Sequence, residues 1–372
     1  MENKISECYE KAKEVLKICS TPNGFFASGG KEGYDAIWAR DSMISSIGAS
    51  LVEDSNEEKE LFKKTFKASL KTLAENQGKT GQIPNCVDKF SRRKPHVDYK
   101  TIDSTLWYII GSFVYQQRYE EESLSKLNQT TEKAMNWLLC QDQGEEGMLA
   151  QLPTSDWQDA FPHKYGYAIS TQALFFKVLK LMKKEKEAEK LKFMTNENVE
   201  TNLWNKNFYL PYRWKNHGIY KEVGYWFDSL GNLLSIIFDL ATNDKAKKIL
   251  SYIKSKKIAD PYPIRSIYPP LTKKSKFWQD YFMDCDAKEP HSYANGGIWG
   301  FVGCFYVLSL IKLKKFEEAE KALSKIAELN LKGNFPEWTH PITKKSYGNL
   351  QAWEAGTFIL AYKSLKEKKV LI

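Results

Sequence analysis

Apolar residues recur at helical spacing along almost the whole chain, and the strict alternation typical of strands is nearly absent. This pattern predicts helices and almost no strands. The twelve expected helices cover residues 4–19, 41–52, 57–75, 103–117, 121–139, 169–183, 185–203, 228–241, 244–255, 297–311, 314–331 and 350–366.

The connections between these helices alternate in length. Loops after the even-numbered helices are short, as at Asp54-Ser55, whereas the loops that precede those helices are long. Long loops inside a compact domain are usually functional. The even-numbered helices recur at a period of roughly 53 to 69 residues, which is typical of an array of helical hairpins. Six hairpins close an (α/α)6 barrel. We therefore predict an all-α, six-hairpin toroid with twelve helices, as one domain over residues 1–372.

The even- and odd-numbered helices also differ in character. Residues 297–304 and 106–114 are apolar nearly all round, as expected of buried inner helices. Residues 62–73 and 316–326 have one apolar stripe and a lysine-rich face, which is typical of outer helices. If inner and outer helices alternate, all long loops emerge at one end of the barrel, beside the N-termini of the inner helices.

Aromatic residues make up 14% of the chain and include 11 tryptophans. Six tryptophans fall in the long loops and three in the first turns of inner helices, so that nine of the 11 are expected at one mouth: Trp38, Trp157, Trp214, Trp226, Trp278, Trp338, Trp107, Trp299 and Trp353. Only Trp137 and Trp204 lie within or directly next to an expected outer helix. Aromatic rings interspersed with carboxylates and amides are typical of carbohydrate binding, because sugar C–H faces stack on rings while hydroxyls bond to polar groups.

Glycoside hydrolysis needs two carboxyl groups, one to protonate the leaving oxygen and one to activate water. The mouth loops and first helical turns contain many acids: Asp35, Asp41, Asp88, Asp98, Asp103, Asp156, Asp159, Asp228, Asp284, Asp286, Glu337 and Glu354. Asp159 follows Trp157 closely, and Glu337 directly precedes Trp338. A large apolar ring desolvates a neighbouring carboxyl and favours its neutral, proton-donating form. Loop or capping roles are the alternative interpretation, and for Asp156 that alternative has equal weight.

A second group of candidates precedes the second expected helix. Tyr34 and Trp38 lie beside the pair Arg40-Asp41, which could hold adjacent sugar hydroxyls. Asp41 could instead be only the helix N-cap, with Arg40 as its structural partner.

Other chemistries have little support in the sequence. It contains no GxSxG, HExxH or P-loop motif, and its five histidines have no metal-ligand spacing, so we expect no metal and no cofactor. Six cysteines without a CxxC pair are typical of thiols in a reducing compartment.

Charge and hydropathy narrow the range of partners. The net charge of +9 resides mostly in lysine-rich stretches such as Lys183-Lys184, which we interpret as solvated helix faces rather than a nucleic-acid site. No run of about 18 apolar residues and no signal peptide is evident, so we expect no membrane partner and a cytoplasmic location. The oligomeric state is not indicated.

The order of motifs along the chain resembles that of neutral/alkaline invertases and of the amylo-α-1,6-glucosidase domain of glycogen debranching enzymes. The matching motifs are Tyr34-x-x-x-Trp38-x-Arg40-Asp41, Gly81-Gln82-Ile83-Pro84, Asp103-Ser104-x-x-Trp107-Tyr108, Trp157-Gln158-Asp159-Ala160, Asp228-x-x-Gly231-Asn232, Ser292-Tyr293-x-Asn295-Gly296-Gly297-x-Trp299, Pro336-Glu337-Trp338 and Gln351-x-Trp353-x-x-Gly356. Each motif is weak alone, but their shared order is specific. These families use the (α/α)6 barrel and cleave an α-glucosidic bond with inversion.

The resemblance implies that Asp159 is the general acid and Glu337 the general base. It also implies a substrate-binding set of Tyr34, Trp38, Arg40, Asp41, Asp103, Trp107, Asp156, Trp157, Asn295, Trp299, Trp338, Gln351 and Trp353. Three places depart from the family pattern: Ser170 stands where a Glu is expected, His163-Lys164 replaces an Arg expected soon after Asp159, and Gly300 replaces a Pro after Trp299.

The sequence thus leads us to expect an exo-acting inverting hydrolase of an α-glucosidic bond in an oligosaccharide or disaccharide. The context of Asp159 slightly favours the amylo-α-1,6-glucosidase type, whereas residues 228–232 and 295–297 look more like an invertase that hydrolyses sucrose. A sugar isomerase or epimerase, or a non-catalytic saccharide-binding protein, is the alternative from another class.

Overall fold

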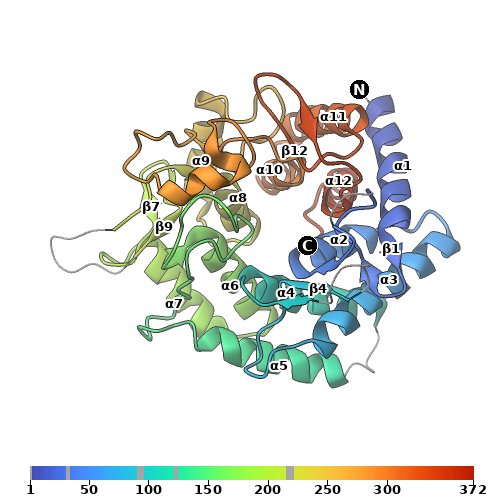
Figure 1. Ribbon diagram of the computed structural model, residues 1–372, viewed down its shortest axis with the longest axis horizontal. Coiled ribbons are helices and arrows are strands. Elements are labelled where there is room, and N and C mark those ends of the chain that lie inside the picture. The colour runs from blue at the N-terminus through green and yellow to red at the C-terminus, as the bar shows by residue number, and fades with distance from the viewer. Residues whose placement is uncertain (1, 31–33, 90–95, 121–124, 215–221) are drawn as a thin grey trace.

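The computed structural model describes residues 2–30, 34–89, 96–120, 125–214 and 222–372. These residues form twelve α-helices arranged in a ring (Figure 1). The helices are α1 (Glu2–Cys19), α2 (Ala39–Ala49), α3 (Asn56–Glu75), α4 (Asp103–Tyr119), α5 (Ser125–Leu139), α6 (Ile169–Leu181), α7 (Glu185–Asn196), α8 (Ser229–Ile237), α9 (Asn243–Ser255), α10 (Gly300–Lys312), α11 (Phe316–Gly333) and α12 (Ala352–Lys366). The predicted (α/α)6 barrel is confirmed.

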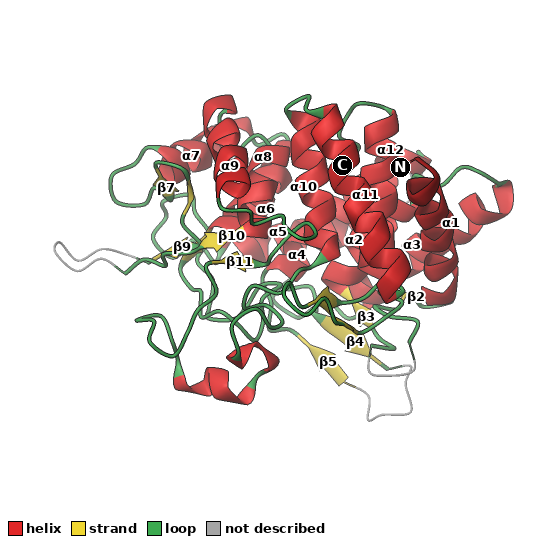
Figure 2. Cartoon of the chain, turned by 90° about the horizontal axis from the view of Figure 1, so that it is seen from above, coloured by secondary structure: helices red, strands yellow, loops and turns green. Residues whose placement is uncertain are grey.

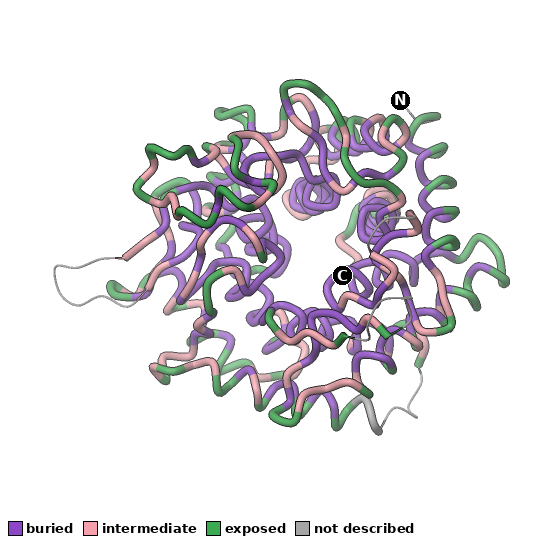
Figure 3. The backbone as a smooth tube through the Cα atoms, viewed as in Figure 1, coloured by how far each residue is buried: buried purple, intermediate pink, exposed green. Residues whose placement is uncertain are grey.

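The helices form two concentric rings. Each even-numbered helix packs against the next even-numbered helix, and α12 packs against α2, so the inner ring is closed. Every residue of α2 and α8 is buried, whereas α9 and α11 bury a single stripe. Figure 3 shows the same contrast, with buried backbone around the centre and exposed backbone at the periphery. None of the helices in the described part of the chain is long and apolar enough to cross a membrane.

Small residues bring the first and last inner helices into backbone contact. A Cβ atom added to Gly48 of α2 would lie 1.8 Å from the carbonyl oxygen of Gly356 in α12. A Cβ atom added to Gly356 would lie 2.5 Å from the Cα atom of Ser45. The Ser45 hydroxyl bonds within its own helix, donating to the Asp41 carbonyl at 2.6 Å, and so needs no partner across the seam. Two glycines therefore allow α2 and α12 to close the ring.

The long loops contain short antiparallel strands, where almost no strands were expected. The strands are β1 (Ser20–Thr21), β2 (Gly24–Phe25), β3 (Ile37–Trp38), β4 (Cys86–Asp88), β5 (His96–Asp98), β6 (Tyr167–Ala168), β7 (Trp204–Asn205), β8 (Phe208–Tyr209), β9 (Tyr212–Arg213), β10 (Phe227–Asp228), β11 (Ile267–Tyr268), β12 (Trp338–Thr339) and β13 (Ser346–Tyr347). Strands β3, β4, β5, β10 and β11 lie at one end of the helices (Figure 2). These ladders satisfy backbone groups of loops that would otherwise be partly buried without partners.

Several helix boundaries differ from the prediction. The helix expected over 185–203 ends at Asn196, and the following residues turn into the β7–β8 hairpin, so Trp204 lies on a strand and not on an outer helix. Residues 121–124 of the helix expected over 121–139 lie outside the described residues. The inner helix expected from 297 begins at Gly300, because Trp299 is its N-cap residue.

Substitution of Gly356 by Ala tests the seam. The added methyl group would collide with the α2 backbone, and overpacking of this kind costs about 1–3 kcal/mol. We expect a loss of that size in the free energy of unfolding, measured by urea titration. Gly78→Ala is the matched control, because a Cβ atom there meets its nearest neighbour at an ordinary 3.4 Å. Equal stability of the two variants would show that the helices are not held at backbone contact.

Candidate active site

The predicted acid and base reach a common space at the loop end of the barrel. Tyr34, in the loop before α2, donates a hydrogen bond from its hydroxyl to Glu337 Oε1 at 3.3 Å, across 303 positions of sequence. Arg40 Nη2 lies 3.7 Å from Asp159 Oδ2. Burial raises the pKa of both Glu337 and Tyr34; in addition, the charge of Asp159 raises the pKa of Glu337, and both carboxyl groups raise the pKa of Tyr34. The structure therefore brings together these four side chains from three separate loops and the first turn of α2.

Arg40 is the fixed cation of this group. Its side chain is buried, and Nη1 donates to both carboxylate oxygens of Asp103, at 3.0 and 2.8 Å. Asp103 is the first residue of α4, so this ion pair joins two neighbouring inner helices. Burial opposes the charge of Arg40, but the surrounding carboxylates raise its pKa, and the guanidinium stays charged.

Burial raises the pKa of Asp103 against the opposing charge of Arg40, and three further carboxyl groups of the site also have raised pKa values. Desolvation raises the pKa of Asp159 to about 6, although Arg40 opposes the shift and 38% of the side chain is exposed. Desolvation raises the pKa of Glu337 to about 7, and the hydrogen bond from Tyr34 opposes this shift. Desolvation likewise raises the pKa of Asp41 to about 7, against Arg40. The site therefore holds protons near neutrality, which is a property of general acid–base sites.

Asp156 lies in a buried charge network behind Asp159. Lys164 Nζ lies 2.8 Å from Asp156 Oδ2 and 2.8 Å from Asp228 Oδ2, and all three side chains are at most 1% exposed. Burial favours the neutral form of Asp156, but Lys164 and neighbouring hydrogen bonds lower its pKa. Ser170 donates to Asp156 Oδ2 at 3.1 Å. Two of the positions that depart from the family pattern, Lys164 and Ser170, thus both contact Asp156. We interpret this aspartate as a positioning residue.

Asn295, another predicted binding residue, is buried and holds loop backbone. Its carbonyl oxygen accepts from the Leu271 amide at 2.7 Å, and its side-chain amide donates to the carbonyls of Leu271 and Ala287, each at 3.0 Å. These bonds fix the long loop that precedes α10. Asn295 is therefore a buried residue that stabilises the backbone of this loop.

The predicted tryptophans pack on other aromatic rings, and three of them pack on one another. Trp157 and Trp299 have ring centroids 5.3 Å apart, Trp299 and Trp353 5.9 Å apart, and Trp353 stacks on Phe301 at 4.0 Å. Trp338 stacks on Tyr347 at 4.2 Å. Trp107 is fully buried in α4, and Gln351, at the N-cap of α12, is 3% exposed. Five buried indole N–H groups have no hydrogen-bond partner among the described residues, those of Trp38, Trp107, Trp157, Trp226 and Trp353.

Sequence reasoning did not select Tyr293 as a binding residue. Glu337, Asp159 and Tyr34 all raise its pKa, after the larger effect of burial, so its hydroxyl shares the space of the proposed acid and base. Its backbone has a φ of 43°, a strained value that non-glycine residues often adopt at functional sites. The available signal was its place in the motif that contains Asn295.

Glu354 is a sequence candidate that does not join this group. It is fully buried. A Cβ atom on Gly300 would lie 2.1 Å from Glu354 Oε1, so the carboxyl faces the α10 backbone. Burial raises its pKa to about 8 against hydrogen bonds from Asn330 and from the Phe301 backbone, which favours the neutral form.

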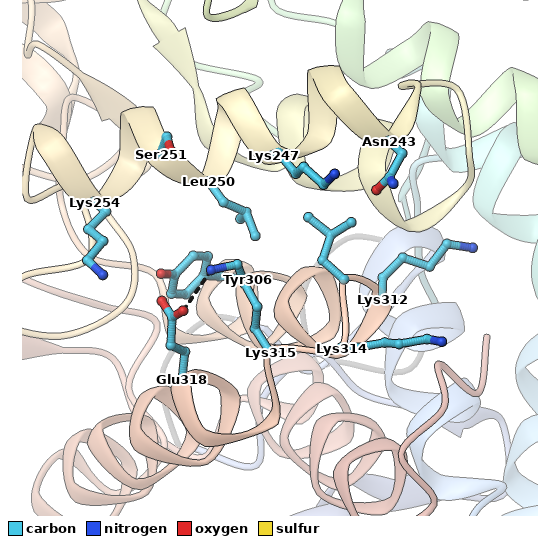
Figure 4. A pocket seen from close by; sticks show the side chains of 11 residues that line it. Asn243, Lys247, Leu250, Ser251, Lys254, Tyr306, Lys312, Lys314, Lys315 and Glu318 are labelled. Atoms are coloured by element: carbon cyan, nitrogen blue, oxygen red, sulfur yellow. Dashed lines mark hydrogen bonds and ion pairs between the residues drawn. The ribbon is translucent and has the colours of Figure 1, made fainter.

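The structure contains one cavity that borders this site and another that lies away from it. One, of about 540 Å³, includes Trp38 and Asp159 in its wall. Another, of about 680 Å³, lies between α9 and the α10–α11 hairpin, and five lysines are among the residues that line it (Figure 4). Its lining carboxylate, Glu318, is paired with Lys315 at 2.7 Å, and it contains none of the predicted site residues. In the described residues, no group of three or more His, Cys, Asp or Glu side chains could hold a metal ion.

The fold is similar to that of the GH63 mannosylglycerate hydrolase from Thermus thermophilus, solved in complex with glucose. The TM-score is 0.68 at 14% sequence identity, and the alignment covers 95% of this chain and 99% of that chain. The protein therefore has the fold of the (α/α)6-barrel glycosidases.

A model of the alkaline and neutral invertase family matches residues 221–368. Alkaline/neutral invertase E of Arabidopsis thaliana, a chloroplastic protein, is 28% identical over 147 residues, which are 38% of this chain and 23% of that protein. The probable alkaline/neutral invertase D of the same plant is 23% identical over 328 residues, 72% of this chain and 60% of that protein. The resemblance to these invertases is confirmed, although the matched part spans less than two thirds of the length of either relative.

Substitution of Lys164 by Met tests the buried charge network. Removal of the ammonium group leaves Asp156 and Asp228 buried without their cation, and breaking a buried pair in this way costs about 3–5 kcal/mol. We expect a loss of that size in the free energy of unfolding near neutral pH, measured by urea titration.

The control for this prediction is Lys325→Met. Lys325 pairs with Asp260 at 2.9 Å, but both side chains are about half exposed, so the pair contributes at most about 1 kcal/mol. If both lysine variants lose equally little stability, the Lys164 network does not support the mouth.

Proposed function

We propose that the protein is an exo-acting inverting glycoside hydrolase that cleaves an α-glucosidic bond. The main support is that Asp159 and Glu337, which belong to two distant loops, lie near each other at the aromatic-lined mouth. Arg40 lies beside the first of them, and Tyr34 is hydrogen-bonded to the second. The invertase match and the glycosidase fold support the same class of reaction.

In this mechanism Asp159 is protonated and Glu337 is ionised. Asp159 donates its proton to the glycosidic oxygen as the bond to the anomeric carbon breaks. Glu337 removes a proton from a water molecule that attacks the opposite face of the sugar, so the product has the inverted configuration. Such pairs are about 6.5–9.5 Å apart, which leaves room for the water.

Desolvation raises the pKa of Asp159 to about 6 and that of Glu337 to about 7, so the two groups titrate in the same pH range. Because the two groups interact, the two titration steps belong to the pair rather than to either residue.

The identity of the α-glucoside defines two candidate activities. The sequence around Asp159 favoured an amylo-α-1,6-glucosidase type. The family match over residues 221–368 and the plant relatives favour an invertase type that hydrolyses sucrose, which is the second candidate. Both activities use the same acid and base on a disaccharide or oligosaccharide.

Asp159→Asn and Glu337→Gln test the catalytic assignment. Loss of either proton-transfer group should lower kcat by about 10²- to 10⁴-fold with little change in the thermal midpoint. The measurement is hydrolysis of sucrose, isomaltose, panose, maltose and trehalose, with the anomer of released glucose followed by NMR. Asp284→Asn, at an exposed acid of the long loop before α10, is the control and should retain activity.

An inverting enzyme releases β-glucose first from an α-glucoside. Sucrose, and panose cleaved at its non-reducing end, release a single glucose that comes from the cleaved α-glucoside, so its first appearance as α-glucose would contradict inversion. A wild-type protein that binds these sugars but hydrolyses none of them would instead be a saccharide-binding protein.

Tyr34→Phe tests the proton arrangement. We expect kcat/KM of the wild-type protein to follow a bell-shaped pH profile with limbs near pH 6 and pH 7, because the doubly protonated pair lacks a base and the doubly ionised pair lacks an acid. The Tyr34 hydrogen bond lowers the pKa of Glu337, so its removal should move the alkaline limb to higher pH. An alkaline limb that does not move would show that Tyr34 does not contact the titrating pair.

A further inference from the structure

The cavity of about 540 Å³ extends sideways from the proposed acid. Trp38 and Asp159 lie in its wall, and Trp137 and Gln141, at and after the end of α5, also line it. Its volume falls within the range of about 300–1,000 Å³ typical of pockets that enclose an organic ligand. The cavity is therefore large enough for more than a single sugar ring.

The cavity borders the proposed acid but not the proposed base. Asp159 is among its lining residues, and Glu337 is not. In an inverting hydrolase the acid stands beside the leaving group, while the base and its water stand on the opposite face of the sugar. A leaving group protonated by Asp159 would therefore lie in this cavity.

The lining suits an uncharged, hydroxyl-rich ligand. Side-chain amides, hydroxyl groups and aromatic rings make up most of it, from Gln82, Asn85, Gln141, Gln151, Thr101, Thr154, Ser155, Trp38, Tyr99 and Trp137, and the aliphatic members are Ile102, Ala150, Leu152 and Pro153. Its charged members besides Asp159 are Asp98 and Lys100, and Lys100 extends into solvent with 82% of its side chain exposed. Lys100 pairs with Asp98 at 3.9 Å, so these two lining charges balance each other and leave no net positive charge for an anionic leaving group.

Hydrogen bonds fix this lining in place. Asn85 donates to Asp98 Oδ2 at 3.0 Å and accepts from the Thr101 hydroxyl at 2.9 Å. The Tyr99 hydroxyl donates to the Asn76 carbonyl at 2.7 Å. The Gln141 side-chain amide donates to the Trp137 carbonyl at 3.0 Å, which ties the end of α5 to the loop that follows. A wall held in this way loses little freedom when a ligand binds.

We propose that this cavity is the leaving-group subsite of the proposed hydrolase, and that it accommodates an uncharged saccharide of two or more sugar units. Trp137, half-buried on α5, is the platform on which the distal sugar stacks. The proposal rests on the proposed function, because the position of the leaving group follows from the acid role of Asp159. It identifies the preferred substrates as oligosaccharides rather than disaccharides.

The test compares substrates with and without a leaving-group sugar. Isomaltotriose, isomaltose and α-glucosyl fluoride are hydrolysed by the wild-type protein and by Trp137→Ala and Trp137→Phe, with maltotriose and maltose as a second linkage series. We expect the wild type to prefer each trisaccharide over its disaccharide in kcat/KM. Trp137→Ala should lower kcat/KM for the trisaccharide by about 3- to 10-fold, the value of one aromatic contact. Its effect on the fluoride, which has no leaving-group sugar, should be less than about twofold.

Two further variants separate binding from folding. Trp137→Phe keeps a ring and should recover most of the trisaccharide activity. Trp204→Ala removes another half-buried tryptophan, one that is not among the lining residues, and should leave the trisaccharide preference unchanged.

The outcomes distinguish this proposal from the proposed function. Hydrolysis of the fluoride without any trisaccharide preference, or an equal loss on fluoride and trisaccharide in Trp137→Ala, overturns the subsite while the hydrolase assignment stands. A wild-type protein that hydrolyses sucrose but none of these substrates overturns the subsite alone. A wild-type protein that hydrolyses neither these substrates nor sucrose overturns the hydrolase assignment and the subsite together.

Discussion

The need to neutralise two buried cations governs the architecture of the mouth. Arg40 and Lys164 are both buried, and a buried charge is costly unless it is paired and hydrogen-bonded. Arg40 is paired with the first residue of α4, and Lys164 is paired with Asp228, whose other oxygen accepts from the Gly231 amide at the start of α8. The loop that contains the proposed acid is therefore anchored to inner helices. The positions of the carboxyl groups follow from the barrel rather than from the loops alone.

The same cations set the electrostatic difference between the two proposed catalytic groups. Asp159 has Arg40 within 3.7 Å, whereas Glu337 is contacted by the neutral hydroxyl of Tyr34. The sequence suggested that Trp157 would desolvate Asp159. In the structure the Trp157 ring packs edge-on against Trp299 and Phe301, and burial by the whole site raises the pKa while Arg40 limits the rise. A substrate that contacts Asp41 or Glu337 would change this proton distribution.

The parts of the structure with a periodic signal were predictable. Helical spacing located the twelve helices, and the alternation of loop lengths placed Asp159 and Glu337 at one end. The two-residue strands were not predictable, because so short a pair leaves no alternation to detect. Glu354 follows Trp353 directly, and on a helix that step turns the side chain to another face, in this case towards the α10 backbone.

The sequence pattern also could not predict the roles of residues that depend on contacts between distant segments of the chain. The sequence context of Asp156 resembles that of an acid at the mouth, but in the structure this side chain is buried and paired with Lys164. The context of Asn295 resembles that of a sugar-binding residue, but its side-chain amide bonds to loop backbone. Trp137 lies on an outer helix, where periodicity indicates packing, and only the three-dimensional arrangement places it in the wall of a cavity.

The α2–α12 seam has a consequence for how the molecule forms. Tyr34 and Glu337, which meet near this seam, are separated by most of the chain, so the site consists of contacts of very high sequence separation. Such contacts form late in folding, after a large loss of chain entropy. During synthesis on the ribosome, the apolar surface of α2 that packs against α12 stays uncovered until α12 has been synthesised and has docked. Nascent chains of this protein are thus candidates for chaperone binding, and catalytic competence arises only in the last step of assembly.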